Sequence, residues 1–379
     1  MISQIKNWNQ LASSTDAEIL DWAEQQNWAI EMAACMQDPA WHAEGDVWTH
    51  TKMVADELAK LDDWDSLSRK TQIKLLVTGL LHDCGKPATT VLDETTGHIR
   101  SPKHAQVGSR MARRLLMEME CDFATREKIC NLVSYHGRPP YLSEKTNPER
   151  ELIKLSAFVD HRLLYRFALA DWRGRISTQP KKGDDQTLTL WEMMAEESHC
   201  LSKPFEFSND HARFLFYRGR LDNLHYTPHE NYRCKMTVMC GLPGAGKNTW
   251  LNRNRPELPV VSLDKLRNEL GVDPTDNQGV VVQSGKERCR EFLRSGTDFA
   301  LNATNITQQT RKLWIDLGAD YNARIEVVYI EPPLKTLFAQ NKDRESRVPA
   351  KVIERLISKL DVPTIAECHE LLTPTFAKS

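Results

Sequence analysis

The sequence lacks any apolar run long enough to cross a membrane. Its longest, around residues 75–81, falls far short of the roughly 20 residues that a bilayer requires. Residues 1–6 also lack the apolar segment of a secretory signal peptide, so we expect no membrane association. None of the nine cysteines forms a C-x-x-C pair, and they are scattered along the chain. Such cysteines are typical of free thiols in a reducing compartment, and we therefore expect a cytoplasmic protein.

An excess of charge of one sign is also absent. The 50 Lys and Arg are balanced by 52 Asp and Glu, for a net charge of -2. This balance argues against a protein that coats duplex nucleic acid by bulk electrostatics, but it allows a local phosphate site. Gly and Pro are few, 17 and 18 of 379 residues, which excludes a collagen-like or largely disordered chain. With 40% hydrophobic residues, a chain of this length is expected to form two domains, each with its own core.

The two halves of the chain have different periodicities. Helical spacing predicts helices over residues 16–26, 48–61, 71–81, 104–119, 124–136 and 148–171, and no convincing strand precedes residue 230. From residue 235 onward, predicted strands at 235–240, 259–262, 298–302 and 324–330 alternate with predicted helices at 279–295, 307–321 and 334–345. That alternation indicates a parallel sheet flanked by helices. We therefore expect an all-α bundle in residues 1–205, a linker in 206–233 and an α/β domain in 234–379.

Six residues in the first half are suitable ligands for a divalent transition metal such as Mn, Co, Ni, Cu or Zn. They are spaced about one helix or helix pair apart, so several helices can each bring a ligand into one bundle core. A lone histidine is more often an ordinary structural residue, as we expect for His98 and His161, and only the whole set indicates a site. The six are His50, His82, Asp83, His104, His136 and Asp171.

The stretch L-L-H-D-C-G-K-P at residues 80–87 is the most informative part of this set. It places His82 and Asp83 at the end of an apolar helix, and Gly85 then turns the chain. Asp83 can bridge two ions, and Lys86 is positioned to meet a phosphate. Two ions held in this way would activate water and polarise a phosphoryl group.

These motifs resemble the HD phosphohydrolase superfamily over about residues 35–180. The similarity rests on T-H-T at 49–51, H-D-C-G-K at 82–86, His104, Y-H-G at 135–137 and A-D-W-R-G-R at 170–175. Residues 41–50 also look like the start of the HD domain of bacterial CCA-adding tRNA nucleotidyltransferases. The resemblance implies a helical domain that hydrolyses phosphate esters, including terminal and cyclic phosphates of RNA. It also implies one ion on His50, His82, Asp83 and Asp171 and a second served by His104 and His136, while His42 and Glu44 either touch substrate or only shape their loop.

In the second half, residues 241–249 read G-L-P-G-A-G-K-N-T and match the pattern G-x-x-x-x-G-K between a strand and a helix. Backbone N–H groups of such a loop surround phosphate oxygens, and the helix N-terminus adds a positive dipole. Lys247 should reach the β- and γ-phosphates of ATP or another nucleoside triphosphate. Asn248 stands where Ser or Thr usually binds Mg²⁺, so that hydroxyl is displaced or absent. The expected nucleotide-binding residues are Gly241, Gly244, Ala245, Gly246, Lys247, Asn248 and Thr249.

Three later groups of residues narrow the chemistry of this half. Asp264 can accept a proton from an attacking hydroxyl, and Arg267, three residues on, can grip a phosphate; alternatively the pair is a helix cap and an exposed arginine. Polar residues end the strand at 298–302 and should line a substrate site. The charged run 341–349 lies where the lid of a P-loop kinase closes on the transferring phosphoryl group. The substrate residues are Arg267, Asn302, Thr304 and Asn305, and the lid residues are Arg344 and Arg347.

This half resembles the polynucleotide kinase branch of P-loop phosphotransferases. The order of the two halves resembles the bacterial bifunctional HD-Pnk family of RNA end-healing enzymes. That resemblance implies removal of a 2′,3′-cyclic phosphate or 3′-phosphate by the first site. It implies Mg²⁺-dependent transfer of a γ-phosphoryl group to a 5′-OH end of RNA or DNA by the second, with the products passed to a separate RNA ligase. Two alternatives stay open: an HD nucleotide phosphohydrolase joined to a small-molecule kinase of the zeta-toxin type, and an RNA-binding regulator whose P-loop only senses nucleotide.

Overall fold

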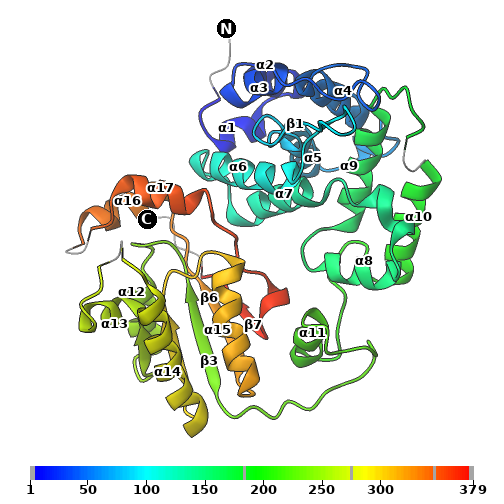
Figure 1. Ribbon diagram of the computed structural model, residues 1–379. Helices are drawn as coiled ribbons and strands as arrows, with labels where there is room; N and C mark the ends of the chain where they lie inside the picture. The colour runs from blue at the N-terminus through cyan, green and yellow to red at the C-terminus, as the bar shows by residue number, and fades with distance from the viewer. Residues whose placement is uncertain (1–4, 182–184, 274–275, 345–346, 375–379) are drawn as a thin grey trace. The chain divides into compact units, whose positions relative to one another are not determined.

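The chain divides after Glu206 into two units, as seen in a computed structural model that describes residues 5–181, 185–273, 276–344 and 347–374. Figure 1 shows that the first unit is helical and that the second is built around a sheet. The expected fold class, an all-α bundle followed by an α/β domain with a parallel sheet, is therefore confirmed. Within the described residues, no helix is both long enough and apolar enough to cross a membrane.

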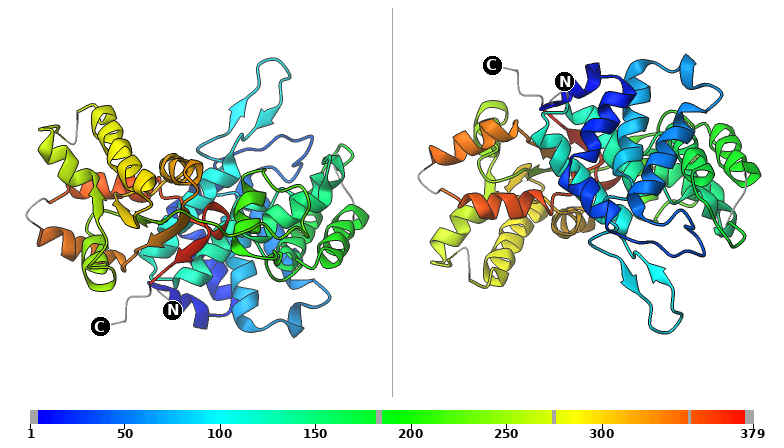
Figure 2. Two further views of the ribbon diagram at one scale, coloured as in Figure 1. Left: turned by 90° about the horizontal axis from the view of Figure 1, so that it is seen from below. Right: turned by 90° about the horizontal axis from the view of Figure 1, so that it is seen from above.

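The first unit is a helical bundle with one short hairpin, β1 (Val91–Leu92) and β2 (Ile99–Arg100). Figure 2 shows this hairpin projecting from the helices of its unit. The sequence did not predict it, because strands of two residues are too short to show an alternating pattern. The helices are α1 (Trp8–Ser13), α2 (Asp16–Glu24), α3 (Asn27–Ala33), α4 (Val47–Ala59), α5 (Arg69–Leu81), α6 (His104–Glu118), α7 (Phe123–Tyr135), α8 (Pro148–Ser156), α9 (His161–Arg173) and α10 (Asp185–Glu197), with 3-10 turns at Trp64–Ser66 and Pro139–Glu144.

Helix α5 is buried continuously from Ile73 to Leu81. Its sequence is apolar on nearly all sides, as expected for a helix surrounded by others. Ser68 caps its first turn by accepting the N–H of Thr71. Because α5 runs through the core and ends at Leu81, the next two residues, His82 and Asp83, are delivered into the interior of the bundle.

The prediction of a single helix over residues 148–171 is wrong, because the structure has two helices in this range. α8 ends at Ser156 and α9 begins at His161. Asp160 caps α9 by accepting the N–H of Leu163, 3.1 Å away. An aspartate that can satisfy the free N–H groups of a new helix favours a break over continuation.

The second unit has a five-stranded parallel sheet in the order β4-β5-β3-β6-β7. Its strands are β3 (Lys235–Cys240), β4 (Val260–Ser262), β5 (Phe299–Asn302), β6 (Arg324–Tyr329) and β7 (Glu370–Leu372). Its helices are α11 (Asp210–Tyr217), α12 (Lys247–Asn254), α13 (Leu263–Glu269), α14 (Gly279–Ser295), α15 (Gln308–Asp320), α16 (Leu334–Lys342) and α17 (Ala350–Ile357), with a 3-10 turn at Ile365–Glu367.

The register of the sheet aligns the ends of three neighbouring strands. Asn302 pairs with Met239 of β3 on one side and with Ser262 of β4 on the other. The segments that follow these strands therefore leave the sheet at the same edge. In an open parallel sheet, ligands bind at this carboxyl edge, where connections diverge to opposite faces.

The segment 206–233, expected to be a linker, contains helix α11. Phe214 and Phe216 of this helix are buried, and Arg213 donates to the carbonyl oxygen of His369 at 2.6 Å. Aromatic residues of this segment thus pack α11 within the second unit.

Candidate active sites

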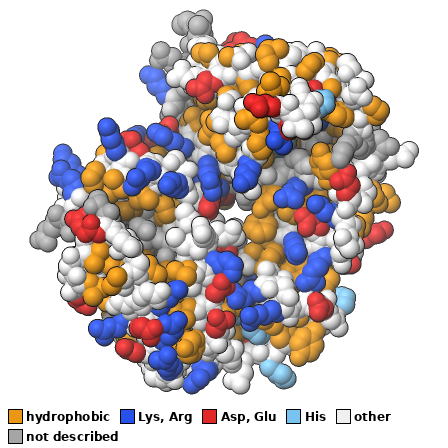
Figure 3. Space-filling model, in the orientation of Figure 1, with side chains coloured by type: hydrophobic (Ala, Val, Ile, Leu, Met, Phe, Trp, Pro, Cys, Tyr) orange, Lys and Arg blue, Asp and Glu red, His pale blue; other side chains and the backbone are white. Residues whose placement is uncertain are grey.

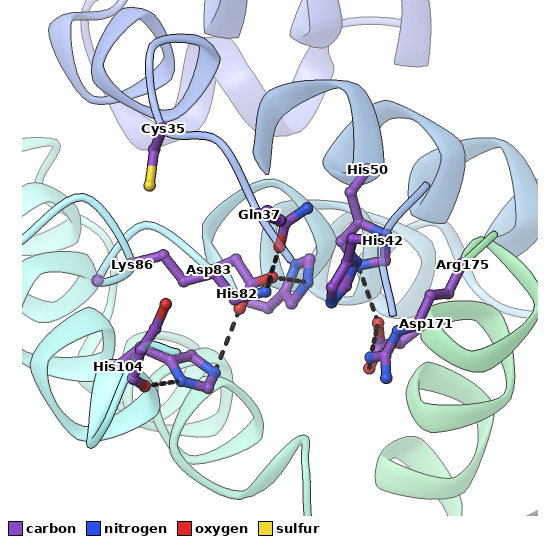
Figure 4. Close-up of polar contacts among 12 residues, drawn as sticks. Cys35, Gln37, His42, His50, His82, Asp83, Lys86, His104, Asp171 and Arg175 are labelled. Atoms are coloured by element: carbon purple, nitrogen blue, oxygen red, sulfur yellow. Dashed lines mark hydrogen bonds and ion pairs between the residues drawn. The ribbon is translucent and has the colours of Figure 1, made fainter. Parts of the chain in front are cut away.

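The six predicted metal ligands lie on, or directly after, five helices of the first unit. His50 lies on α4 and Asp171 on α9, while His82 and Asp83 follow α5. His104 opens α6, and His136 directly follows α7. All are buried except His104, which is partly exposed. The structure brings the whole set together, as Figure 4 shows for all but His136, which it does not label.

Asp83 stands between two groups of histidines. Its Oδ2 atom lies 3.1 Å from Nε2 of His82. Its Oδ1 atom lies 3.3 Å from Nε2 of His104 and 3.8 Å from Nε2 of His136. The ligand atoms of His50, His82 and Asp83 lie within 4.8 Å of one another, as do those of Asp83, His104 and His136. Asp83 is therefore common to both groups, and its carboxylate would contribute to an ion held in either one.

The hydrogen bonds of three histidines fix their tautomers. Nδ1 of His82, His104 and His136 lies 2.7, 2.8 and 2.8 Å from the backbone carbonyl oxygens of Gly79, Ser101 and Val133. A carbonyl oxygen can only accept, so each Nδ1 carries the proton and each neutral ring presents an unprotonated Nε2. Metal-binding histidines are oriented in the same way by the partner of their other nitrogen.

The unprotonated Nε2 atoms of these histidines lie close to one another and to the carboxylate of Asp83, and none of these groups carries a proton to donate. Nε2 of His104 and Nε2 of His136 are 3.4 Å apart, and burial lowers the pKa of His104 and lowers that of His136 to about 3. Nε2 of His82 and Oδ1 of Asp83 are buried and have no hydrogen-bond partner among the described residues. Buried lone pairs without a donor are costly, and a cation satisfies them. The residues present therefore fit divalent metal ions.

Positive groups surround the same carboxylates. Lys86 Nζ lies 2.7 Å from Asp83 Oδ2 and 2.6 Å from Oε1 of Gln37. Burial alone would raise the pKa of Asp83, but its interactions with His82 and with the Lys86 ammonium outweigh burial and hold that pKa well below its ordinary value. Lys86, predicted to meet a phosphate, thus lies within the cluster and pairs with Asp83.

Two further sets of residues lie at this site. Arg175 was not predicted to be functional, and the roles of His42 and Glu44 had two alternatives. Arg175 lies 3.2 Å from Oδ1 of Asp171, and its Nε has no hydrogen-bond partner among the described residues. Arg175 lies just beyond the end of α9, and its spacing of four residues from Asp171 was the signal in the sequence. Glu44 Oε1 lies 2.8 Å from Nδ1 of His42 and 3.0 Å from Nδ1 of His50. His42 and Glu44 therefore lie against His50, and all three form another potential ligand group.

The Gly-rich loop of the second unit joins β3 to α12. Gly241 has no room for a side chain, because a Cβ there would lie 2.4 Å from the carbonyl oxygen of Ile330. Gly246 precedes α12 with a φ of 95°, a left-handed conformation that favours glycine. Lys247 folds back on the loop, with Nζ 2.7 Å from the carbonyl oxygen of Gly241 and 3.0 Å from that of Leu242. Burial lowers the pKa of Lys247 to about 8.

A cavity of about 840 Å³ opens beside this loop. The predicted residues that line it are Gly244, Gly246, Lys247, Asn248, Thr249, Asp264, Asn302, Thr304 and Arg344. It is also lined by Val348 of the charged run and by Trp250, Arg253, Asn254, Gln340 and Pro374, which no sequence motif indicated. The cavity thus joins the loop, the polar ends of β4 and β5, and the segment after α16. Residues 345–346 of the predicted lid lie outside the described residues.

Asp264 and Arg267 form an ion pair on α13. Arg267 Nη1 lies 2.6 Å from Asp264 Oδ1, and Arg267 Nε donates to Oε1 of Gln278 at 2.8 Å. The Asp264 side chain is 76% exposed and lines the cavity, whereas Arg267 does not line it. The carboxylate of Asp264 is therefore accessible to a ligand in the cavity. Arg267, which is outside the cavity lining, orients this carboxylate through the ion pair.

Some predicted residues lie away from the cavity. Asn305 is buried with a φ of 47°, and its Nδ2 donates to the carbonyl oxygen of Met239 at 2.9 Å. It therefore braces the turn after β5 instead of lining the site. Gly241 and Ala245 are buried and do not line the cavity, and Arg347 is exposed and donates to the carbonyl oxygen of Lys342. The polar composition of these segments did not reveal which side chains turn inward.

Two family models match the chain. Residues 47–160 match the model described as HD domain, and residues 236–363 match the model described as AAA domain. With the histidine–aspartate cluster in the first and the P-loop in the second, the chain combines an HD domain with a P-loop kinase-like domain. These matches support an enzyme with phosphohydrolase and kinase activities.

Among curated proteins, the chain is similar to L-seryl-tRNA(Sec) kinase of Methanococcus maripaludis, with 20% identity over 135 residues. The match covers 34% of this chain, which spans about half of that relative, 53%. Among solved structures, a protein of Chloroflexus aurantiacus proposed to be a kinase aligns with a TM-score of 0.33 and 16% identity, over 38% of this chain and 85% of its own. A sugar kinase of Janibacter sp. aligns with a TM-score of 0.30 and 16% identity, over 37% and 85%.

Proposed function

We propose that this protein heals broken RNA ends with two separate active sites. The first unit hydrolyses 2′,3′-cyclic phosphate and 3′-phosphate ends, and the second transfers the γ-phosphoryl group of a nucleoside triphosphate to a 5′-OH end. The products, a 3′-OH and a 5′-phosphate, are substrates for a separate RNA ligase. The observation that carries the proposal is the pairing, in one chain, of a histidine–aspartate cluster that fits metal ions with a P-loop cavity that contains an accessible carboxylate.

In the first site, the proposed ligands are His50, His82, Asp83 and Asp171 for one ion and His104 and His136, with Asp83, for another. Ions bound there would polarise the phosphoryl group and activate water. Arg175, with a side chain 33% exposed and an unpartnered Nε, is positioned to donate to a phosphate oxygen. Glu44 fixes the ring of His50 from the side away from Asp171. Hydrolysis of the cyclic ester breaks one bond from phosphorus to a ribose oxygen, and a second hydrolysis releases inorganic phosphate.

In the second site, Lys247 and the loop N–H groups hold the β- and γ-phosphates of the donor. Asp264 accepts the proton of the acceptor hydroxyl as its oxygen attacks the γ-phosphorus. The bond from that phosphorus to the β-phosphate oxygen breaks, and a nucleoside diphosphate leaves. Arg344, which lines the cavity, is positioned to stabilise the charge of the transferring group.

The charge distribution supports a substrate that is held at its end. On the face drawn in Figure 3, Lys and Arg side chains are interspersed with acidic and apolar ones. With a net charge of -2, such a surface suits contacts with a few nucleotides better than contacts along a duplex. RNA is the proposed substrate, and DNA ends are an arm of the test.

The similarity to L-seryl-tRNA(Sec) kinase favours a second candidate function, a kinase for a hydroxyl group on a small molecule or an aminoacyl group. The HD domain would then act on nucleotides. The same cavity and the same Asp264 would serve this reaction, so the fold does not separate the two candidates. A nucleotide sensor without catalysis is less well supported, because the accessible carboxylate lies beside the loop.

The identity of the preferred phosphoryl acceptor distinguishes these functions. Purified protein with radiolabelled ATP and Mg²⁺ would be offered 5′-OH RNA and DNA oligonucleotides, nucleosides, UDP-sugars and seryl-tRNA in parallel. We expect oligonucleotides with a 5′-OH to be labelled at least tenfold more efficiently, by kcat/KM, than the other acceptors. Preferential labelling of a nucleoside, a UDP-sugar or seryl-tRNA would replace the polynucleotide assignment.

A further inference from the structure

The residue after the P-loop lysine normally contributes a hydroxyl group to the Mg²⁺ that accompanies the nucleotide. Here that residue is Asn248, the second residue of α12. Thr249 carries a hydroxyl group, but it lies one residue further on and therefore about 100° further round the helix. The question is which oxygen replaces the missing one.

The structure gives Asn248 a fixed orientation. Nδ2 of Asn302 donates to Oδ1 of Asn248 at 2.6 Å, and both residues line the cavity. Asn302 is the last residue of β5 and is only 9% exposed, so the surrounding residues hold its side chain in place. The bond turns the amide oxygen of Asn248 toward the edge of the sheet where β3, β4 and β5 end.

The chemistry of this oxygen suits magnesium. Mg²⁺ prefers hard oxygen ligands, and an amide oxygen is one. An amide oxygen has two lone pairs, of which the bond from Asn302 uses one. One oxygen of the Asp264 carboxylate, which lines the same cavity, is engaged by Arg267 at 2.6 Å, and the other is available to the acceptor hydroxyl.

We propose that Oδ1 of Asn248 is a ligand of the nucleotide-bound Mg²⁺ and that Asn302 is a positioning residue that aims it. The hydrogen bond from Asn302 takes the place of the short, rigid geometry that a serine has at this position. This proposal rests on the proposed kinase function of the same cavity. Its test uses nucleotide binding without an acceptor, so it does not depend on which acceptor the enzyme phosphorylates.

The experiment measures the affinity of the full-length protein for ADP and for a non-hydrolysable ATP analogue, with and without Mg²⁺, by calorimetry. For each nucleotide, the ratio of the affinity with Mg²⁺ to the affinity without Mg²⁺ reports the coupling between nucleotide and metal. Asn248→Ala should lower that ratio by roughly tenfold or more, the scale seen when metal-site groups are removed, and should leave the metal-free affinity nearly unchanged. Asn302→Ala should lower it in the same direction by a smaller factor. Asn252→Ala is the matched control, because Asn252 lies on the same helix but is exposed and does not line the cavity.

Asn248→Ser tests the positioning role. This variant restores the usual hydroxyl ligand, so Mg²⁺ should still strengthen nucleotide binding as in the wild type. Adding Asn302→Ala to it should change the ratio of affinities with and without Mg²⁺ very little. An unchanged Mg²⁺ effect in Asn248→Ala would overturn the proposal. It would also be overturned if Asn248→Ala weakened binding equally with and without Mg²⁺, since the amide would then contact phosphate directly. Failure to phosphorylate any 5′-OH polynucleotide would contradict the proposed function alone.

Discussion

At the scale of single residues, Asp264 separates a kinase from a nucleotide sensor. The Asp264 carboxylate is exposed to the cavity and does not belong to the loop that should hold the triphosphate. Asp264→Asn keeps the shape of the side chain and removes its basicity. The single-turnover rate of phosphoryl transfer should fall by roughly 10²–10⁴-fold, the usual contribution of a general base, while nucleotide affinity stays within a few-fold of wild type. Glu269→Gln, an exposed change on the same helix, is the control.

A wild-type transfer rate in Asp264→Asn would reduce the residue to a surface carboxylate and remove the main support for catalysis at this site. Arg267→Ala belongs to the same measurement. Its guanidinium pairs with Asp264 and does not line the cavity. We therefore expect Arg267→Ala to lower the transfer rate by a smaller factor than Asp264→Asn.

The pH dependence of nucleotide binding should report Lys247. Burial lowers its pKa to about 8, so the free protein loses this positive charge as the pH rises above that value. Binding of a triphosphate requires the ammonium form, and it must then be accompanied by uptake of a proton. Nucleotide affinity should therefore fall by about tenfold per pH unit above pH ~8.

Lys247→Arg provides the contrast for this titration, because arginine keeps its charge throughout the same range. Its affinity, although weaker, should be nearly constant from pH 7 to about 9.5. Calorimetry in buffers of different ionisation enthalpy would measure both the affinity and the proton uptake. A wild-type affinity that does not change across this range would show that Lys247 keeps its charge in the free protein.

At the scale of elements, the ends of helices orient the histidines that are proposed to bind metal. The rings of His82 and His136 follow α5 and α7 and bond to carbonyl oxygens three residues earlier. Four imidazoles favour transition metals over Mg²⁺, which prefers oxygen ligands. After chelation, Mn²⁺, Co²⁺, Ni²⁺, Cu²⁺ or Zn²⁺ should restore 3′-end hydrolysis and Mg²⁺ alone should not, as measured on 3′-phosphate RNA. Full restoration by Mg²⁺ only would contradict the ligand set.

The contact of α6 with the turn after α5 is another feature at this scale. A Cβ on Gly85 would lie 2.2 Å from the carbonyl oxygen of His104 and 2.6 Å from the backbone nitrogen of Gly108. Gly85→Ala should push α6 away, moving His104, and destabilise the first unit by about 1–3 kcal/mol. Gly137→Ala, with no atom within 4 Å of its Cβ, is the control. We expect thermal unfolding and hydrolase activity to change only in the first variant, with kinase activity unaffected; equal behaviour of the two would exclude tight packing at Gly85.

Periodicity predicted those elements whose burial follows a simple repeat. β3 and α14 have the bounds that the sequence indicated, because a buried strand and an amphipathic helix each have a continuous pattern. The break between α8 and α9 depends on a capping hydrogen bond, and β7, three residues long, pairs with β6 from a distant part of the chain. Such features depend on tertiary contacts that a local pattern does not contain.

At the scale of the whole molecule, the sequence indicated which residues lie close together better than it indicated their individual contacts. The histidines and aspartates of the first unit lie together as expected, because their number, their spacing and the H-D motif marked them as a set. The sequence did not separate Asn305, which braces a turn, from Asn302, which lines the cavity. It did not reveal the contacts of Glu44 with His42 and His50 either, because these depend on the path of a loop. The side of a loop to which a polar residue turns is decided by packing.

The central claim is that one chain repairs both ends of a break through two independent sites. The most direct measurement follows both termini of a single RNA that carries a 5′-OH and a 2′,3′-cyclic phosphate, incubated with ATP, Mg²⁺ and Mn²⁺. Wild-type protein should yield 5′-phosphate and 3′-OH ends. His82→Ala combined with Asp83→Ala should leave the cyclic phosphate intact while phosphorylating the 5′ end, and Lys247→Ala should do the reverse. The account would be contradicted by 3′-end hydrolysis in the double variant, by near wild-type phosphorylation in Lys247→Ala, or by a wild-type protein that leaves both ends unchanged.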